Sequence, residues 1–200
     1  LIVGDTLNAL SSDPATAKER RIVEIAAFLP PDTIVEEWLR TIVAEDMPDF
    51  ADGAAPPGYK DPWRMALGTL ARRGLLTEVP GTDLPTLRMH RLVAEHVQCL
   101  APKGLEEEVR RRAIGGVDER TSWYDLTRRR SPLLARPLFE PLRVWIEFLL
   151  HDGPDDRALI LSAGVVGTAD ALAGPATRGL ALIEKCVVVA RRLAATDTAD

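Results

Sequence analysis

Apolar residues recur at every third or fourth position through much of the first hundred residues, which is typical of helices with one buried face. Three such stripes cover residues 22–29, 34–43 and 63–70. Side chains suited to helix N-caps precede them, at Ser11 to Asp13, at Asp32 or Thr33, and at Asp61. Pro30-Pro31 ends the first helix, and the Pro- and Gly-rich segment 47–58 is predicted as a loop. The pattern therefore predicts three consecutive helices.

The periodicity changes at "GLLTEVPGTDLPTLRMH", residues 74–90. Two short apolar runs flank a Pro-Gly-Thr-Asp turn, which predicts a β-hairpin with strands at about 75–79 and 86–90. A helix from Arg91 to about Leu100 follows, with an apolar stripe at Leu92, Val93, His96, Val97 and Leu100. Three helices, a hairpin and a helix are the order of a winged helix-turn-helix. We predict this domain over residues 10–101, with the third helix in the recognition position and the hairpin as the wing.

The remainder, residues 104–195, is predicted to be an α-helical bundle. Residues 105–114 form a charged amphipathic helix, and "ERTSWYDLTRRRSPLLARP", 119–137, is interpreted as a junction. Leu138, Leu142, Trp145 and Leu149 indicate another helix, and residues 159–173 and 179–195 indicate an antiparallel helix pair. A helical pair of this kind suggests the entry to a tetratricopeptide-like repeat array. The fold class is therefore mainly α.

Composition describes an ordinary protein surface with a net charge of -5, and a dedicated nucleic-acid binder is usually basic. The longest weakly polar run, about ten residues at 158–167, is too short to span a membrane. Cys99 and Cys186 are too few for a disulfide framework, and we expect both to be buried in a reducing, cytoplasmic setting. The absent initiator Met and the ending "ATDTAD" suggest a piece of a longer protein.

Catalytic signatures such as GxGxxG, GxxxxGK[ST], HExxH, CxxC and GxSxG are missing from the sequence, so we do not expect an enzyme. His96 is expected to be half-buried and hydrogen-bonded, and His90, His96 and Cys99 supply too few ligands for structural zinc. His90 stands where the second hairpin strand meets a helix. Its imidazole could donate to a phosphate at the helix N-terminus, or it could simply fix the strand-to-helix turn.

DNA binding is the alternative that a winged helix raises. The third predicted helix carries Arg64, Arg72 and Arg73, but the last two stand at its C-terminal end, whereas base contacts come from the N-terminal part. The wing carries an acidic residue and no basic one. Nucleic acid is therefore not expected as a partner. The four Trp residues are interpreted mostly as core or interface anchors, and Arg128–Arg130 as a solvated junction.

"RIVEIAAFLPPDTIVEEWL" and "ALGTLARRGLLTEVPGTDLPTLRMHRLVAEHV" together resemble the winged-helix segment of bacterial STAND-type signalling ATPases of the NB-ARC kind. The family's closing motif, M/V-H-[RD]-L-[VI], is matched by Met89 to Val93, and the resemblance covers residues about 10–100. "GLALIEKCVVVARRLAATDTAD" resembles the second helix of a tetratricopeptide repeat. Position 91 is arginine where plant-like motifs have aspartate, so the role of that aspartate is not carried over.

The resemblance implies that His90 reaches the β-phosphate of ADP held by an upstream nucleotide-binding domain in cis, which would bind ADP or ATP with Mg. The chain would then be the switch-and-linker part of a signal-transduction ATPase. It would couple nucleotide state to protein partners bound by its C-terminal helices, without hydrolysing ATP by itself. Two alternatives remain open: a winged-helix transcriptional regulator with a helical sensing domain, and a helical protein-interaction scaffold that needs no nucleotide.

Overall fold

The computed structural model describes residues 16–56, 58–151, 156–173 and 176–197. The chain divides into two compact units between Arg112 and Ala113, within helix α6. The predicted start of the first helix at Ser11–Pro14 lies outside the described residues. The mainly helical fold class is confirmed, and a small three-stranded antiparallel sheet accompanies the helices.

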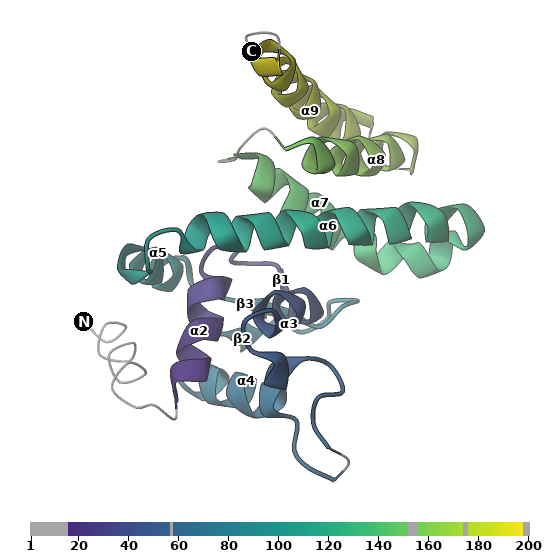
Figure 1. Cartoon of the computed structure of the whole chain (residues 1–200). Helices are drawn as coiled ribbons and strands as arrows, with labels where there is room; N and C mark the ends of the chain where they lie inside the picture. The colour runs from purple at the N-terminus through teal and green to yellow at the C-terminus, as the bar shows by residue number, and fades with distance from the viewer. Residues whose placement is uncertain (1–15, 57, 152–155, 174–175, 198–200) are drawn as a thin grey trace. The chain divides into compact units, whose positions relative to one another are not determined.

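In its described residues, the first unit contains four helices, a short 3₁₀ turn and the sheet, and it continues into the start of α6. Figure 1 shows these helices and strands. Its elements in chain order are α2 (Ala17–Ala26), β1 (Ile34–Val35), α3 (Glu36–Ala44), η2 (Pro48–Phe50), α4 (Pro62–Arg72), β2 (Thr77–Glu78), β3 (Thr86–Arg88) and α5 (Arg91–Leu100). The predicted hairpin is confirmed, although both strands are shorter than expected. Asp61 caps α4 as predicted, because its side chain accepts a hydrogen bond from the Trp63 backbone N–H at 3.0 Å.

One strand was not predicted. Ile34 and Val35 pair with Thr86 and Leu87 of β3, so the sheet order is β1-β3-β2, and α3 begins only at Glu36. The expected cap at Asp32 or Thr33 is therefore wrong, and Val35 occupies the N-cap position. The physical reason is that two buried β-branched residues fit a strand as well as the first turn of a helical stripe.

The core of the first unit lies where the predicted stripes meet the sheet. Its largest side chains with almost no exposure are Ile22, Ile25, Leu29, Ile34, Leu39, Phe50, Trp63, Leu70, Leu76 and Met89. The rings of Phe50 and Trp63 meet edge-to-face at 5.8 Å between centroids, which favours a fixed packing of η2 against α4.

The second unit is helical throughout its described residues. It contains the rest of α6 (Leu105–Arg130), then α7 (Pro132–His151), α8 (Arg157–Ala173) and α9 (Ala176–Asp197). The predicted junction at 119–137 is wrong over most of its length, because α6 runs without a break to Arg130. Asp125 pairs with Arg128 at 2.5 Å and with Arg129 at 2.7 Å within one turn, so the arginine run is held in the helix.

The predicted pair α8–α9 is confirmed. Positions facing one another run in opposite directions, since Gly167 lies against Ile183 and Ala171 against Gly179. Trp145 and Cys186 are buried as expected, whereas Trp123 is half exposed and is not a core residue. None of the described helices is both long and apolar enough to span a membrane.

Candidate functional site

The segment Met89–His90–Arg91 joins β3 to α5, where the sequence predicts the functional histidine. Met89 is completely buried, and its backbone N–H donates to the Pro31 carbonyl at 2.8 Å. This anchor fixes the chain just before His90, whose extended backbone (φ -65°, ψ 133°) makes it the N-cap of α5. The structure therefore places His90 at the strand-to-helix turn, as the sequence predicts.

His90 caps the helix with its own ring. Nδ1 accepts a hydrogen bond from the Leu92 backbone N–H at 3.2 Å, and the His90 carbonyl accepts from Val93 at 2.8 Å and Ala94 at 3.0 Å. An accepting Nδ1 carries no proton, so the proton of the neutral ring is on Nε2. Since His90 is exposed, this Nε2–H is a donor on the surface of the unit.

The backbone of this helix start is less available to an anion than the sequence suggests. The N–H groups of Leu92, Val93 and Ala94 already donate to His90. The first turn therefore has few unsatisfied donors of the kind that bind phosphate at helix N-termini. What remains is one imidazole N–H, which can contact one phosphate oxygen but cannot hold a nucleotide by itself.

Arg91 pairs with Asp32 across 59 positions of the sequence, at 2.9 Å between Nη2 and Oδ2. Both side chains are well exposed, at 74% and 54%, so the pair is worth at most about 1 kcal/mol. The pair instead helps to orient the start of α5. The ion pair joins the start of α5 to the turn before β1, and it engages the one cation next to His90 in sequence.

Two expectations on α5 are wrong. His96 and Cys99 are both exposed, whereas the sequence predicts a half-buried histidine and a buried thiol. The buried face of α5 is formed by Val93, Ala94 and Val97, and Leu92 and Leu100 point outward. The apolar stripe predicted for α5 is therefore broader than the face of the helix that packs against the rest of the unit. Within the ranges that the structure describes, no group of three or more His, Cys, Asp or Glu side chains could hold a metal ion.

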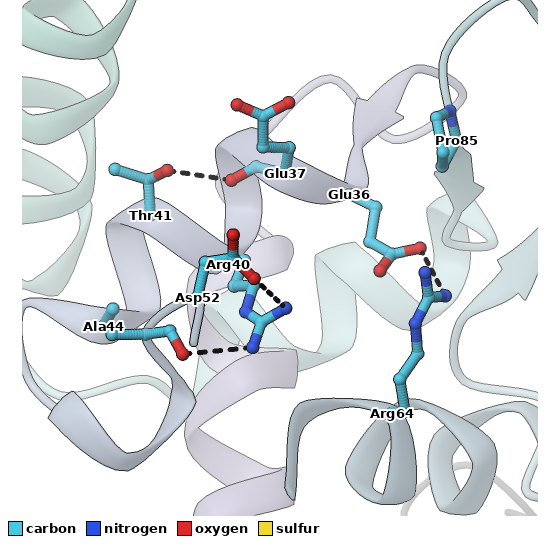
Figure 2. Close-up of a pocket in the computed structure, with 9 residues that line it drawn as sticks. Glu36, Glu37, Arg40, Thr41, Ala44, Asp52, Arg64 and Pro85 are labelled. Carbon is cyan, nitrogen blue, oxygen red and sulfur yellow. Dashed lines mark hydrogen bonds and ion pairs between the residues drawn. The ribbon is translucent and has the colours of Figure 1, made fainter. Parts of the chain in front are cut away.

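A hollow of about 460 Å³ lies beside α3 and α4, and the sequence did not point to it (Figure 2). Its lining residues are Glu36, Glu37, Arg40, Thr41, Ala44, Ala51, Asp52, Arg64 and Pro85. Glu36 is only 7% exposed and accepts from the Trp63 indole Nε1 at 3.0 Å and from Arg64 at 3.1 Å. This carboxylate therefore joins the first turn of α3 to the first turn of α4.

Arg40 occupies the other side of the hollow. Its guanidinium donates to the carbonyls of Phe50 at 2.6 Å and Ala51 at 3.1 Å, and it pairs with Asp61 at 3.1 Å and Asp52 at 3.3 Å. Both arginines of the hollow are thus engaged in fixing α3, η2 and α4 to one another. The charged side chains at the hollow hold the elements of the unit together. Because acidic and basic groups are paired there, the hollow does not favour either an anionic or a cationic ligand.

A second polar cluster ties the beginning of α6 to α2 and α3. The buried Arg112 guanidinium pairs with Asp46 at 2.6 Å, with Glu45 at 3.1 Å and with Glu108, and Arg21 pairs with Asp46 at 2.6 Å. The hydrogen bond from Arg112 lowers the pKa of Asp46 below its ordinary value, against the opposing effect of burial. The partners lie 66 and 25 positions from Asp46, so no local sequence signal could have found the cluster.

Comparison with known proteins gives no relative: no family model, no curated protein and no solved structure matches the chain.

Proposed function

We propose that this chain is the regulatory switch-and-linker segment of a nucleotide-dependent signal-transduction ATPase, with His90 as its sensor of bound ADP. The order α2-β1-α3-α4-β2-β3-α5, with β1 and β2 flanking β3, supports a winged helix for the first unit. In this interpretation the β2–β3 hairpin is the wing. The unpredicted strand β1 strengthens the proposal, because a winged helix commonly closes its small sheet with a strand between its first two helices.

The observation that carries the proposal is the orientation of the His90 ring. Nδ1 accepts the hydrogen bond from the Leu92 N–H, which fixes the ring and leaves the proton on Nε2 of an exposed side chain. A phosphate oxygen accepts from a fixed N–H donor without requiring the helix to rearrange. The residues present thus fit one contact to a nucleotide phosphate, and an upstream nucleotide-binding domain would supply the remaining contacts and the Mg-binding groups.

The basic residues of α4 do not favour the DNA-binding alternative. Arg64 is held by the buried carboxylate of Glu36, and Arg72 donates to Thr69 on its own helix. The N-terminal half of α4, which would enter a major groove, therefore offers a neutralised charge. The second unit fits the remaining part of the proposal, a cytoplasmic partner-binding element that begins a repeat array with α8 and α9.

The proposal is tested with the full-length product of the gene. We expect a GxxxxGK[ST] loop in the sequence that precedes Leu1, and we expect ADP to co-purify with the protein in about one equivalent. Binding to a DNA duplex is measured in parallel at two salt concentrations, since phosphate contacts give a steep salt dependence. Purification without nucleotide together with salt-sensitive duplex binding would replace this proposal with the transcriptional one.

A further inference from the structure

Asp170 is a buried carboxylate at the end of an apolar helix face. Only 3% of the residue is exposed, and its Oδ2 atom has no hydrogen-bond partner among the residues that the structure describes. The buried face of α8 to which it belongs consists of Leu159, Ala163, Val166 and Asp170, at spacings of four, three and four positions. An unpaired charge is costly in such a place, so a carboxylate there calls for a cationic partner.

The buried face of α6 ends on a cation in the same way. Val117, Thr121, Tyr124 and Arg128 follow one another at the same spacings of four, three and four positions, and the first three are at most 5% exposed. The Nε atom of Arg128 is buried and has no hydrogen-bond partner within the described ranges, while its Nη2 pairs with Asp125 on its own helix at 2.5 Å. The two buried faces therefore end in opposite charges.

The positive end of α6 and the negative end of α8 lie at the same level. The Ser162 hydroxyl of α8 donates to Asp118 of α6 at 3.3 Å, and further along both helices the charge of Asp170 acts on Tyr124. The two helices thus run in the same direction where they meet. Asp170 follows Ser162 by eight positions, a rise of about 12 Å. The same rise along α6 from Asp118 ends between Tyr124 and Arg128.

The hydroxyl of Tyr124 lies among the charged groups of this end. Burial raises the pKa of its phenol, Arg128 lowers that pKa, and Asp125 and Asp170 raise it further. Both carboxylates and the guanidinium therefore act on one hydroxyl, and Arg128 is the cation of the three. Arg129 also pairs with Asp125, at 2.7 Å, so Asp125 keeps a counter-charge when Arg128 leaves it.

We propose that Arg128 exchanges between two carboxylates, Asp125 on its own helix and Asp170 on α8. In the arrangement that the structure shows, Arg128 is on Asp125, and Oδ2 of Asp170 has no partner in the described part of the chain. In the other arrangement, an Arg128–Asp170 ion pair joins the ends of the two buried faces, and Arg129 remains on Asp125. Arg128 keeps one ion pair in each arrangement, so the two are close enough in free energy for a population shift.

The exchange is a latch between α6 and the α8–α9 pair. Asp170 stands in the last turn of α8, next to Ala171, against which Gly179 of α9 packs. A pair between Arg128 and Asp170 therefore ties α6 to the crossing of α8 and α9, and the return of Arg128 to Asp125 releases that tie. This inference goes beyond the proposed function. It involves neither His90 nor a nucleotide, so the two proposals fail separately.

A double-mutant cycle in the 200-residue chain tests whether Arg128 compensates the charge of Asp170. Asp170→Asn removes that charge, and Arg128→Gln removes the cation. By urea unfolding, we expect Asp170→Asn to raise the folding equilibrium constant at least about tenfold more in the Arg128→Gln background than in the wild type. Arg129→Gln is the matched control, because Arg129 shares Asp125 but is 70% exposed, and it should leave the effect of Asp170→Asn unchanged. An equal effect of Asp170→Asn in all three backgrounds would overturn the proposal.

Nuclear magnetic resonance distinguishes an exchange from a fixed pair and needs only the two asparagine variants. The assigned Nε–Hε signal of Arg128 should shift in Asp125→Asn and also in Asp170→Asn, because each substitution removes one of its two partners. The signal of Arg129 should shift in Asp125→Asn alone. A response of Arg128 to Asp125→Asn alone would leave the pair as the structure shows it, and a response to Asp170→Asn alone would indicate a permanent pair with α8. Either result would overturn the exchange.

Discussion

The Nδ1 atom of His90 accepts the backbone N–H of Leu92 at 3.2 Å, so one nitrogen of the ring is committed to the fold. The same bond determines the tautomer and leaves Nε2 as the donor of this exposed side chain. The two interpretations that the sequence left open are therefore not exclusive. His90 fixes the strand-to-helix turn through Nδ1, and in the proposed function it contacts a phosphate through Nε2.

The capping role of His90 can be tested by measuring protein stability, without any nucleotide. His90→Ala removes the cap of α5 and should lower the free energy of unfolding by about 0.5–1 kcal/mol, the lower part of the range for N-caps because the site is exposed. His90→Ser should leave it nearly unchanged, since a serine hydroxyl can accept the same backbone N–H. Urea unfolding followed by circular dichroism measures both, and an equal loss in the two variants would show that capping is not what the ring contributes.

Replacing Glu36 by glutamine should destabilise the protein less than replacing it by alanine. Glu36→Ala leaves the completely buried Trp63 indole N–H without its acceptor, which costs about 1–3 kcal/mol. Glu36→Gln retains an acceptor and loses the ion pair with the exposed Arg64, worth at most about 1 kcal/mol. The urea midpoints of the two variants test this order, and a glutamine variant as unstable as the alanine one would contradict it.

Gly179 should be intolerant of even a methyl group. A Cβ there would lie 2.4 Å from the Ala171 backbone nitrogen and 2.5 Å from the Gly167 carbonyl oxygen, so α8 and α9 would have to separate. We expect Gly179→Ala to cost about 1–3 kcal/mol, as overpacking of a tight contact does. Thermal unfolding followed by circular dichroism measures the change.

Gly164 provides the matched control on the same helix pair. Apart from the adjoining residues and backbone of α8 itself, no heavy atom lies within 4 Å of its Cβ position. Gly164→Ala should therefore stabilise α8 by about 0.5–1 kcal/mol through helix propensity. The two alanine substitutions are therefore predicted to move the unfolding temperature in opposite directions. A shift of the same sign would show that the close crossing at Gly179 is relaxed in solution.

The Asp46 cluster predicts a contribution to stability that disappears in acid. Arg112 holds the pKa of Asp46 below its ordinary value of 3.8, so the folded state favours the ionised form. This contribution is complete above the ordinary pKa, and it is lost as pH falls from about 5 through the lowered value. Asp46→Asn should thus destabilise the protein at pH 7 and have a smaller effect at pH 3.

Urea unfolding at pH 7, 5 and 3 measures the difference in the free energy of unfolding between the wild type and Asp46→Asn. Asp49→Asn is the control, because Lys18 also lowers the pKa of Asp49 but both side chains of that pair are mostly exposed. We expect the control to show the same sign and a much smaller change. A constant difference between wild type and Asp46→Asn across the three pH values would contradict the role of this cluster.

Local patterns predicted most helices of this fold, because helical periodicity and caps such as Asp61 are encoded within one or two turns. They failed where burial is decided by distant residues. Ile34 and Val35 match a helical stripe in the sequence, but in the structure they pair with β3. Cys99 was expected to be buried, but it lies on a side of α5 that does not pack against the rest of the unit. The position of His90 was predicted, but the use of its Nδ1, and the clusters around Glu36 and Asp46, depend on partners that only the fold brings together.

We propose that the Nε2–H of His90 donates a hydrogen bond to a phosphate oxygen of bound ADP. The most direct measurement is ADP affinity by calorimetry on the full-length protein, comparing wild type, His90→Ser and His90→Ala. We expect both variants to lose about 1.5–3 kcal/mol of ADP binding free energy, the range for a hydrogen bond to a charged group, although serine preserves the helix cap. ADP affinity in His90→Ser equal to that of the wild type would contradict it, and His90 would then be a capping residue alone.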